Sequence, residues 1–276
     1  MNKFSAKKIK GILKEIEAQP LKGLGQNFLI NQKILAEIVE SAQLSKKDIV
    51  LEVGAGIGNL TLVLAPKVKK VIAFEIDKKL FKILQKNTKK LKNVEIFNKD
   101  IRKVDLEKFF KHKTFKVVAN IPYYLTSFLL RKLFSLQNKP RLILLLVQKE
   151  LEERIMACPP KMNLLALSVQ LFSKPKIVKK VKKGNFWPTP KVDSVLILLK
   201  TKKETKKLEA NFLLRLAKIG FSGKRKMLKN NLKKGLKLNE QEVLETFKKA
   251  GIRKNSRAEE LALKNWQKLA IFTKNK

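Results

Sequence analysis

Short apolar runs alternate with segments of helical periodicity through roughly the first 160 residues of the chain. Alternation of this kind is typical of a parallel sheet with helices on both faces, so the chain is predicted to be an α/β protein. The apolar runs predict strands at 49–53, 71–76, 94–98, 115–119 and 141–147. Apolar positions three or four residues apart predict helices at 7–18, 31–41, 58–66, 78–88, 125–137 and 149–157.

Beyond residue 164 the pattern changes, because three apolar runs follow one another without helices between them. These runs are predicted to add strands to one edge of the sheet, some of them antiparallel. They are LALSVQLF at 165–172, KIVKKV at 176–181 and VDSVLILL at 192–199.

A charged stretch at 201–207 follows the last of these runs, and every later segment has helical periodicity. Residues 201–276 contain 22 Lys and Arg against 7 Asp and Glu. We therefore expect two domains, a large one at 1–203 and a small basic helical one at 204–276.

The stretch from Val50 to Asp77 is typical of a nucleoside-binding unit, with an apolar run, a glycine-rich turn, a helical segment and a second apolar run. Glycines at 54, 56 and 58 would let the backbone approach a ligand closely. Glu75 ends the second run, where a carboxylate can accept the protons of both ribose hydroxyls.

The glycine spacing favours S-adenosyl-L-methionine over a dinucleotide. The dinucleotide fingerprint needs a third glycine three residues after the second, where this chain has Asn59. A sulfonium cofactor has no pyrophosphate that needs a helix N-terminus. Because polar residues at the carboxyl ends of parallel strands meet in one crevice, we expect Glu52, Glu75, Asp100 and Asn120 to converge there.

A second motif, NIPYY at 120–124, directly follows the predicted strand at 115–119. It suits the methylation of a planar exocyclic amine, whose nitrogen is a poor nucleophile. The Asn120 side-chain oxygen and a backbone carbonyl near Ile121 or Pro122 could accept the two amino protons and aim the nitrogen, so that orientation supplies most of the rate. Tyr123 would stack on the base. An Asn-x-Pro turn with buried tyrosines is the structural alternative.

A third stretch, GNFWPTPKVDS at 184–194, supplies another aromatic residue. Phe186 could close over the other face of a base that has left its stack, since enzymes acting on a base edge extrude that base. Trp187 is an equal candidate for this position, and simple packing would also explain it.

Composition points to a polyanionic partner. The net charge is +40, from 63 basic and 23 acidic residues, and nucleic acid is the simplest partner, although a lysine-rich proteome would explain part of the excess. The chain has one cysteine, Cys158, and one histidine, His112, so we expect no disulfide, no metal site and no histidine-based triad. We expect no catalytic role for Cys158. The apolar run at 142–147 is too short to span a membrane, and a cytoplasmic protein is expected.

Several motifs together resemble the small-subunit ribosomal RNA adenine N6,N6-dimethyltransferase family, over residues 20 to 270. The motifs are GQNFL (25–29), EVGAGIG (52–58), FEID (74–77), Asp100, NIPYY (120–124), FWPTPKVDS (186–194), FSGKRKMLKNNL (221–232) and RAEELAL (257–263).

The resemblance implies a Rossmann-like methyltransferase fold with a seven-stranded, mostly parallel sheet and a C-terminal all-helical domain. In this reading residues 1–203 bind S-adenosyl-L-methionine and carry out catalysis, and residues 204–276 bind RNA. The enzyme would dimethylate two adjacent adenosines in the 3′-terminal hairpin loop of small-subunit ribosomal RNA. Its partners would be that RNA and the pre-ribosomal small subunit, and it would act as a monomer in small-subunit biogenesis.

The resemblance also implies roles for individual residues. Asn27 and Leu29 would border the cofactor, and Gly54 would lie in its loop. Glu75 would hold the ribose hydroxyls and Asp100 would meet the adenine amino group. Asn120 would sit at the methyl-transfer point and also contact the cofactor, and Pro122 would act beside it in catalysis. Tyr123 and Phe186 would be the base clamp.

The sequence departs from the family pattern at Lys99, where a glycine is usual, and at LLALSV (164–169). Three other functions are weighed against this one. A large-subunit enzyme of the macrolide-resistance type shares the cofactor residues, but Asp193 and the FSGKRK stretch favour the small subunit. A DNA adenine methyltransferase usually has proline in place of Ile121. A non-catalytic ribosome assembly factor would not need its cofactor positions intact.

Overall fold

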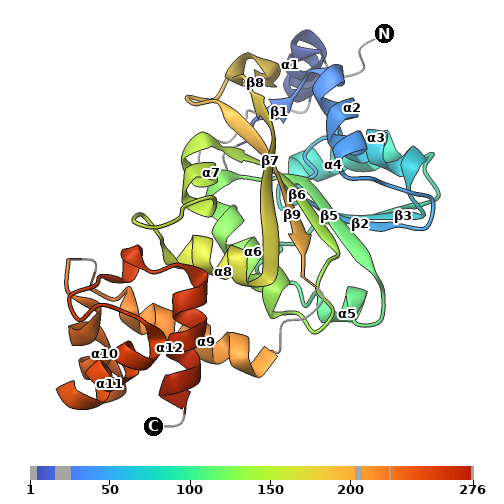
Figure 1. Cartoon of the computed structure of the whole chain (residues 1–276). Helices are drawn as coiled ribbons and strands as arrows, with labels where there is room; N and C mark the ends of the chain where they lie inside the picture. Colours follow the sequence, from blue (N-terminus) through green and yellow to red (C-terminus); the bar gives the residue numbers. More distant parts are fainter. Residues whose placement is uncertain (1–4, 16–25, 203–206, 224, 275–276) are drawn as a thin grey trace. The chain divides into compact units, whose positions relative to one another are not determined.

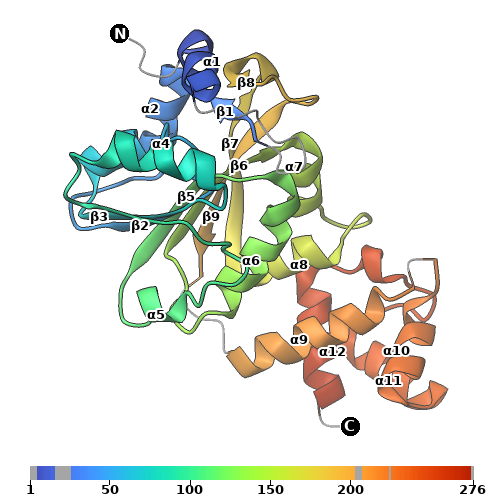
Figure 2. The same ribbon diagram turned by 180° about the vertical axis from the view of Figure 1, so that it is seen from behind.

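The structure is a computed structural model that describes residues 5–15, 26–202, 207–223 and 225–274 (Figures 1 and 2). The chain forms two compact units. The first comprises Met1–Glu152 and Pro175–Thr201, and the second comprises Glu153–Lys174 and Lys202–Lys276.

A seven-stranded sheet in the order β4-β3-β2-β5-β6-β9-β7 dominates the described part of the chain (Figure 1). The pairings among β2 to β6 are parallel, and β9 runs antiparallel to β6. The expected mostly parallel sheet is therefore confirmed. The strands are β2 (Ile49–Val53), β3 (Lys70–Phe74), β4 (Val94–Phe97), β5 (Phe115–Asn120), β6 (Leu142–Gln148), β7 (Ser173–Val181) and β9 (Ser194–Thr201).

The sequences of these strands are continuous apolar runs because the strands are buried. The first six residues of β6 are all buried, and both faces of a central parallel strand are covered, so neither face needs polar residues. The helices of the N-terminal part are α1 (Ala6–Glu15), α2 (Gln32–Ser41), α3 (Thr61–Leu64), α4 (Lys78–Thr88), α5 (Glu107–Phe110), α6 (Thr126–Ser135) and α7 (Lys149–Ile155).

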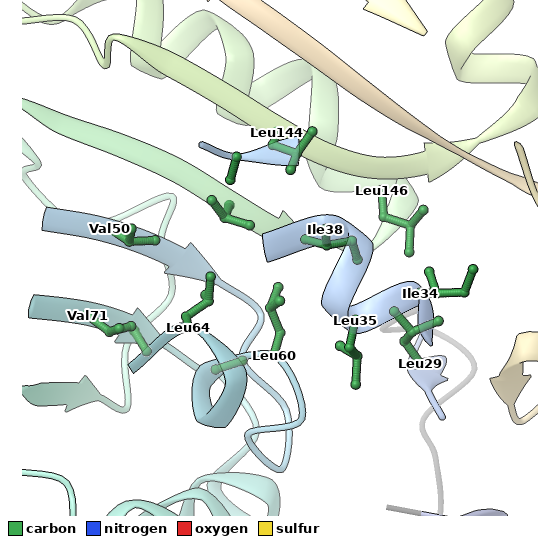
Figure 3. Close-up of a cluster of buried hydrophobic side chains, with 14 of the residues drawn as sticks. Leu29, Ile34, Leu35, Ile38, Val50, Leu60, Leu64, Val71, Leu144 and Leu146 are labelled. Atoms are coloured by element: carbon green, nitrogen blue, oxygen red, sulfur yellow. The ribbon is translucent and has the colours of Figure 1, made fainter. Parts of the chain in front are cut away.

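One core cluster joins α2 and α3 to the sheet (Figure 3). Leu144 and Leu146 lie two residues apart on β6 and therefore point to the same face. The cluster fixes α2 against the strands whose ends carry the polar residues of interest. Its labelled members are Leu29, Ile34, Leu35, Ile38, Val50, Leu60, Leu64, Val71, Leu144 and Leu146.

Polar side chains begin two of the helices that flank the site, α2 and α4. Asn31 accepts hydrogen bonds from the Lys33 and Ile34 N–H groups at the start of α2. Asp77 does the same for Lys79 and Leu80 at the start of α4. Such caps satisfy N–H groups that have no partner inside the helix.

The helix expected at 58–66 is shorter than predicted. Gly58 lies in the preceding loop with φ of +94°, and α3 covers only Thr61–Leu64 before a 3-10 turn at Ala65–Lys67. The left-handed conformation at Gly58 is incompatible with a helix and delays its start.

One expected strand is wrong. The run LALSVQLF lies in helix α8 (Leu164–Phe172), not in a strand. The run is apolar on nearly all sides and six residues of the helix are buried, so hydrophobic pattern alone cannot separate a buried helix from a buried strand. The deciding signal is Asn163, whose side chain accepts from the Ala166 N–H and caps the helix.

A two-stranded antiparallel ribbon is an element that the sequence did not predict. It pairs β1 (Phe28–Leu29) with β8 (Phe186–Trp187), with Phe28 opposite Trp187 and Leu29 opposite Phe186. Strands of two residues leave no measurable alternation in the sequence.

The second unit is helical, as predicted for the C-terminal part. Trp266 is fully buried and stacks on Phe221, with ring centroids 5.5 Å apart. Its helices are α8, α9 (Lys207–Gly220), α10 (Leu228–Leu236), α11 (Glu240–Ala250) and α12 (Leu263–Lys274). Because α8 belongs to this unit, the compact units have different bounds from the continuous division at 203 and 204. No helix in the described ranges is long and apolar enough to cross a membrane.

Candidate active site

A cavity opens at the carboxyl ends of the parallel strands in the first unit. The empty space inside it, including the part open to solvent, is about 1040 Å³. Its walls come from the segment before α2, the β2–α3 loop and the ends of β3, β4 and β5. The residues at 26–29, 52–56, 74–76, 99–102, 120–122 and 124–125 line it.

The glycine loop is shaped by close backbone contacts. The N–H groups of Gly54 and Ala55 both donate to the Phe74 carbonyl, at 2.8 and 3.2 Å. Gly54 has φ of +73°, and a Cβ atom there would lie 3.3 Å from Cδ of Pro122. The loop after β2 therefore packs directly on the NIPYY loop, and glycine is required by conformation and by space.

Glu75 lies at the end of β3 and is only 5% exposed. Its Oε2 accepts from the Gly56 N–H at 2.7 Å, and its Oε1 accepts from the Asp77 N–H at 2.9 Å. Burial raises the pKa of Glu75, and these two backbone bonds oppose the rise. The carboxylate is thus fixed against the glycine loop, and each oxygen keeps further capacity to accept a hydrogen bond.

Glu52 lines the same cavity at 1% exposure, and the sequence assigns it no separate role. Burial first, and then the charge of Glu75, raise its pKa to about 8, although Thr61 opposes the shift. No described residue donates a hydrogen bond to its Oε2. A buried carboxyl oxygen without a partner indicates that the cavity is built for a ligand that forms a hydrogen bond at this position.

The Asn120 amide is oriented by a backbone carbonyl. Its Nδ2 donates to the Asn27 carbonyl oxygen at 3.1 Å. A carbonyl can only accept, so the amide nitrogen must face Asn27 and the Oδ1 atom is left on the other side. No described residue donates to that oxygen. The Asn120 side chain is therefore oriented so that its Oδ1 atom can accept a hydrogen bond from a ligand.

The rest of the NIPYY motif is only partly described. Pro122 lines the cavity, and its carbonyl accepts from the Leu125 N–H at 3.0 Å. The side chain of Tyr123 lies outside the described part of the structure. Tyr124 also lines the cavity and is 51% exposed, which the sequence did not predict.

Asn59 ties β1 to the glycine loop, and the sequence missed this role too. Its Nδ2 donates to the Leu29 carbonyl at 2.8 Å, while Leu29 itself is 2% exposed. Asn59 is 7% exposed, lines the cavity and has no partner for its Oδ1 among the described residues. The only sequence signal was its position beside the third glycine of the loop.

Asp100 also lies on the cavity, where Arg102 covers it. The Arg102 side chain and backbone N–H all donate to its carboxylate, and they are the main reason why the pKa of Asp100 is lowered. The sequence gave Asp100 a role and Arg102 none.

Phe186 lies opposite Leu29 in the β1–β8 ribbon but does not join the other predicted site residues at the cavity. Its side chain is 2% exposed and belongs to the core cluster that contains Leu29, and it does not line the cavity. Trp187, its neighbour on β8, stacks on Phe28 with centroids 6.4 Å apart, and Lys10 lies 5.9 Å above the Trp187 ring. Side chains alternate along a strand, so the two aromatics face opposite sides of the ribbon and pack on different hydrophobic clusters.

Metal-ligand clusters are absent from the part of the chain that the structure describes, where no group of three or more His, Cys, Asp or Glu side chains converges. Cys158 is a free, exposed thiol. The donor set of the cavity is instead made of carboxylates, amides and backbone groups, which suits an organic ligand with hydroxyl and amino groups.

A family model described as ribosomal RNA adenine dimethylase matches residues 19–275. Two curated relatives are both named ribosomal RNA small subunit methyltransferase A. The one from Dehalococcoides mccartyi is 39% identical over 259 residues and covers 92% of this chain and 89% of the relative. The one from Alkaliphilus oremlandii is 39% identical over 276 residues and covers 96% of each.

Solved structures show the same fold. A dimethyladenosine transferase from Plasmodium falciparum has a TM-score of 0.75 and 31% identity, covering 88% of this chain and 95% of that one. The 23S rRNA methyltransferase ErmE has a TM-score of 0.71 and covers 89% of this chain and 98% of that one. Its identity of 24% limits that likeness to the fold. The expected methyltransferase fold is confirmed.

Proposed function

The chain belongs to the ribosomal RNA adenine dimethylase family, and from this premise we propose how its own residues carry out the reaction. The enzyme transfers methyl groups from S-adenosyl-L-methionine to the exocyclic amino groups of two adjacent adenosines. These lie in the 3′-terminal hairpin loop of small-subunit ribosomal RNA. The names of the curated relatives support the small subunit. The single observation that carries the mechanism is the Asn120 amide, held by the Asn27 carbonyl with its oxygen free.

The cavity fits the cofactor on chemical grounds. Glu52 Oε2 and Asn59 Oδ1 are buried polar atoms that lack partners among the described residues. A Cβ atom at Gly54 or Gly56 would lie 3.3 Å from Pro122 or 3.2 Å from Phe28, closer than usual, so glycine keeps this loop tight. Glu75 would hold the ribose hydroxyls and Asp100 would meet the adenine amino group. Asn27 and Leu29 would border the cofactor beside the loop at Gly54. When bound, S-adenosyl-L-methionine supplies an electrophilic methyl group on a positively charged sulfur.

Asn120 and Pro122 would aim the target nitrogen. Asn120 Oδ1 accepts a hydrogen bond from one amino N–H of the adenosine. The Pro122 carbonyl keeps one lone pair beside its bond to Leu125 and can accept the other. Because the nitrogen lone pair is delocalised into the base, holding it at the right angle contributes more than a strong base would.

Two aromatic residues would hold the flipped base, Tyr123 on the NIPYY loop and Phe186 on β8. Phe186 packs in the core, so it can reach the base only if β8 turns its side chain outward. Comparing turnover of Tyr123→Ala, Phe186→Ala and Trp187→Ala tests this part. An effect at Trp187 but not at Phe186 would move the clamp to the neighbouring residue.

The C-terminal segment at 204–276 would bind RNA. Its support is charge, since residues 201–276 carry 22 basic against 7 acidic side chains. The protein would act as a monomer in the cytoplasm on the pre-ribosomal small subunit. Light scattering of the protein alone and with isolated subunits checks the oligomeric state and the partner.

Mass spectrometry of nucleosides tests the function directly. Small and large ribosomal subunits that lack the modification are incubated separately with enzyme and S-adenosyl-L-methionine. We expect N6,N6-dimethyladenosine at two adjacent positions of the small-subunit RNA only. Methylation confined to large-subunit RNA would overturn the substrate. Cofactor binding without any transfer would point to a non-catalytic assembly factor.

A further inference from the structure

Arg102 contacts both oxygens of the Asp100 carboxylate. Its Nε donates to Oδ1 at 3.0 Å and to Oδ2 at 2.9 Å. Its Nη2 lies 2.7 Å from Oδ2, and its backbone N–H donates to Oδ1 at 2.9 Å. The single hydrogen on Nε is shared between the two oxygens, so three N–H groups of Arg102 approach a carboxylate that offers about four lone-pair positions.

The backbone of this loop is held separately from the guanidinium. Lys132 Nζ donates to the carbonyls of Ile101 and Arg102, at 2.9 and 3.0 Å. The side chain of Arg102 is 52% exposed, whereas that of Asp100 is 14% exposed. The guanidinium can therefore swing into solvent without moving the loop, while the backbone N–H stays on Oδ1.

We propose that Arg102 is an internal competitor for Asp100, which occupies the carboxylate until the adenine amino group of the cofactor displaces the guanidinium. The inference rests on the proposed function, in which Asp100 meets that amino group. The guanidinium contacts both oxygens and Arg102 itself lines the cavity, so a donor that enters the cavity competes with it for the carboxylate. Arg102 therefore lowers the affinity for the cofactor and for the demethylated product alike, which favours their exchange between successive transfers.

The opposite role would be preorganisation, in which Arg102 holds Asp100 in the binding geometry. The two roles predict opposite changes in cofactor affinity when the Arg102 side chain is removed. Removing a competitor tightens binding, and removing a support weakens it. The bonds through Nε and Nη2 engage both oxygens, and Arg102 lines the cavity that the cofactor would enter, which favours competition over support.

Isothermal calorimetry with S-adenosylhomocysteine measures the direction of this change in affinity without any methyl transfer. Arg102→Leu should lower the Kd about two- to fivefold, since exposed ion pairs hold their partners only weakly. Lys103→Leu is the matched control, because it removes the same charge one residue away and Lys103 has no side-chain bond to Asp100. The control should leave the Kd within about twofold.

A double-mutant cycle separates this inference from the proposed function. In an Asp100→Ala background, Arg102→Leu should have no effect, because there is no carboxylate left to compete for. If Asp100→Ala alone does not weaken binding, the proposed cofactor site is wrong. If it does, but Arg102→Leu leaves binding unchanged or weakens it, the competition is refuted and the site stands.

Discussion

At the scale of single residues, the cavity holds carboxyl groups in opposite electrostatic states. Burial raises the pKa of Glu52 and of Glu75, whereas the Arg102 guanidinium lowers that of Asp100. A site with one charged and two destabilised carboxylates can accept a cationic ligand and still recognise a neutral amino group. Asn120 completes it as an oriented acceptor.

Glu52 should make stability depend on pH. Its pKa is raised from 4.5 to about 8, so between these values the folded protein keeps a proton that the unfolded chain releases. The free energy of unfolding therefore falls as pH rises through this window, by at most about 1.4 kcal/mol per pH unit. The Glu52→Gln variant lacks this pH dependence. Its free energy of unfolding, relative to that of the unsubstituted protein, should therefore increase from pH 5 to pH 8. Urea denaturation across that range measures the difference, and a flat difference would contradict the prediction.

Asn120→Ala should reduce kcat by about a hundredfold or more and change the Kd for S-adenosylhomocysteine by less than about threefold, because the amide orients the target and not the cofactor. Asn120→Asp should be as inactive, since a carboxylate cannot donate to the Asn27 carbonyl. Single-turnover kinetics and calorimetry give the two quantities. Asn138→Ala is the control, because Asn138 bonds only the carbonyls of Phe110 and Lys113 and should affect stability alone. Equal losses of turnover and affinity at Asn120 would speak against its role.

At the scale of elements, glycines allow loops and helices to approach one another closely at their points of contact. The glycine loop touches the NIPYY loop at Gly54 and the Phe28 ring at Gly56. In the second unit, Gly220 ends α9 against the fully buried Trp266 of α12. These close approaches fix which backbone segments can lie next to one another.

Gly220→Ala should destabilise the second unit by about 2 to 3 kcal/mol, because overpacking a rigid core forces side chains or backbone to shift. The new Cβ would lie 2.4 Å from Cη2 of Trp266 and 2.8 Å from Cδ1 of Leu228. Gly11→Ala in α1 is the control, since nothing lies within 4 Å of its Cβ position. That change should stabilise the helix by up to about 1 kcal/mol. Tryptophan fluorescence during denaturation follows the first variant, and an unchanged midpoint would refute the steric argument.

At the scale of the whole molecule, the excess of positive charge implies binding dominated by RNA phosphates. The net charge is +40, and basic residues are dense in both the first 200 residues and the C-terminal segment. The location of the lysines decides whether they bind RNA or merely solvate the surface.

Replacing Lys234, Lys248 and Lys249 with Gln should flatten the salt dependence of RNA affinity. All three are exposed in the second unit. The slope of log affinity against log salt should fall by roughly 0.7 to 0.9 for each RNA phosphate that the variant no longer neutralises. Cofactor affinity should not change. Filter binding of a small-subunit RNA fragment at several salt concentrations measures the slope.

The matched control for that triple variant is Lys67, Lys69 and Lys92 changed to Gln. These exposed lysines lie near the amino ends of β3 and β4, opposite the cavity edge of the sheet. They should leave the slope unaltered. If both triple variants lower it equally, the charge acts as a diffuse field and the C-terminal segment has no special RNA-binding role. Deleting residues 204–276 is a poorer test, because α8 would lose the helices that bury it.

Local pattern was sufficient for the sheet and for the ends of its parallel strands. The runs at β2, β3, β5 and β6 are apolar because both faces are covered, and the polar residue after each parallel strand must face the same edge. Glu52, Glu75, Asp100 and Asn120 were therefore predictable as neighbours, and all four line one cavity.

Tertiary contacts decided what pattern could not. The segment LALSVQLF forms a helix because Asn163 caps it and because the helices of the second unit bury it. A segment that is buried on all sides shows no hydrophobic periodicity from which its secondary structure could be predicted. Phe186 points into the core because β8 pairs with β1, and Arg102 covers Asp100 because a turn folds its side chain back. Sequence by itself determined which groups meet at the edge of the sheet. Only the folded chain decided which of their atoms are already bonded, because hydrogen-bond partners and side-chain directions arise from segments distant in sequence.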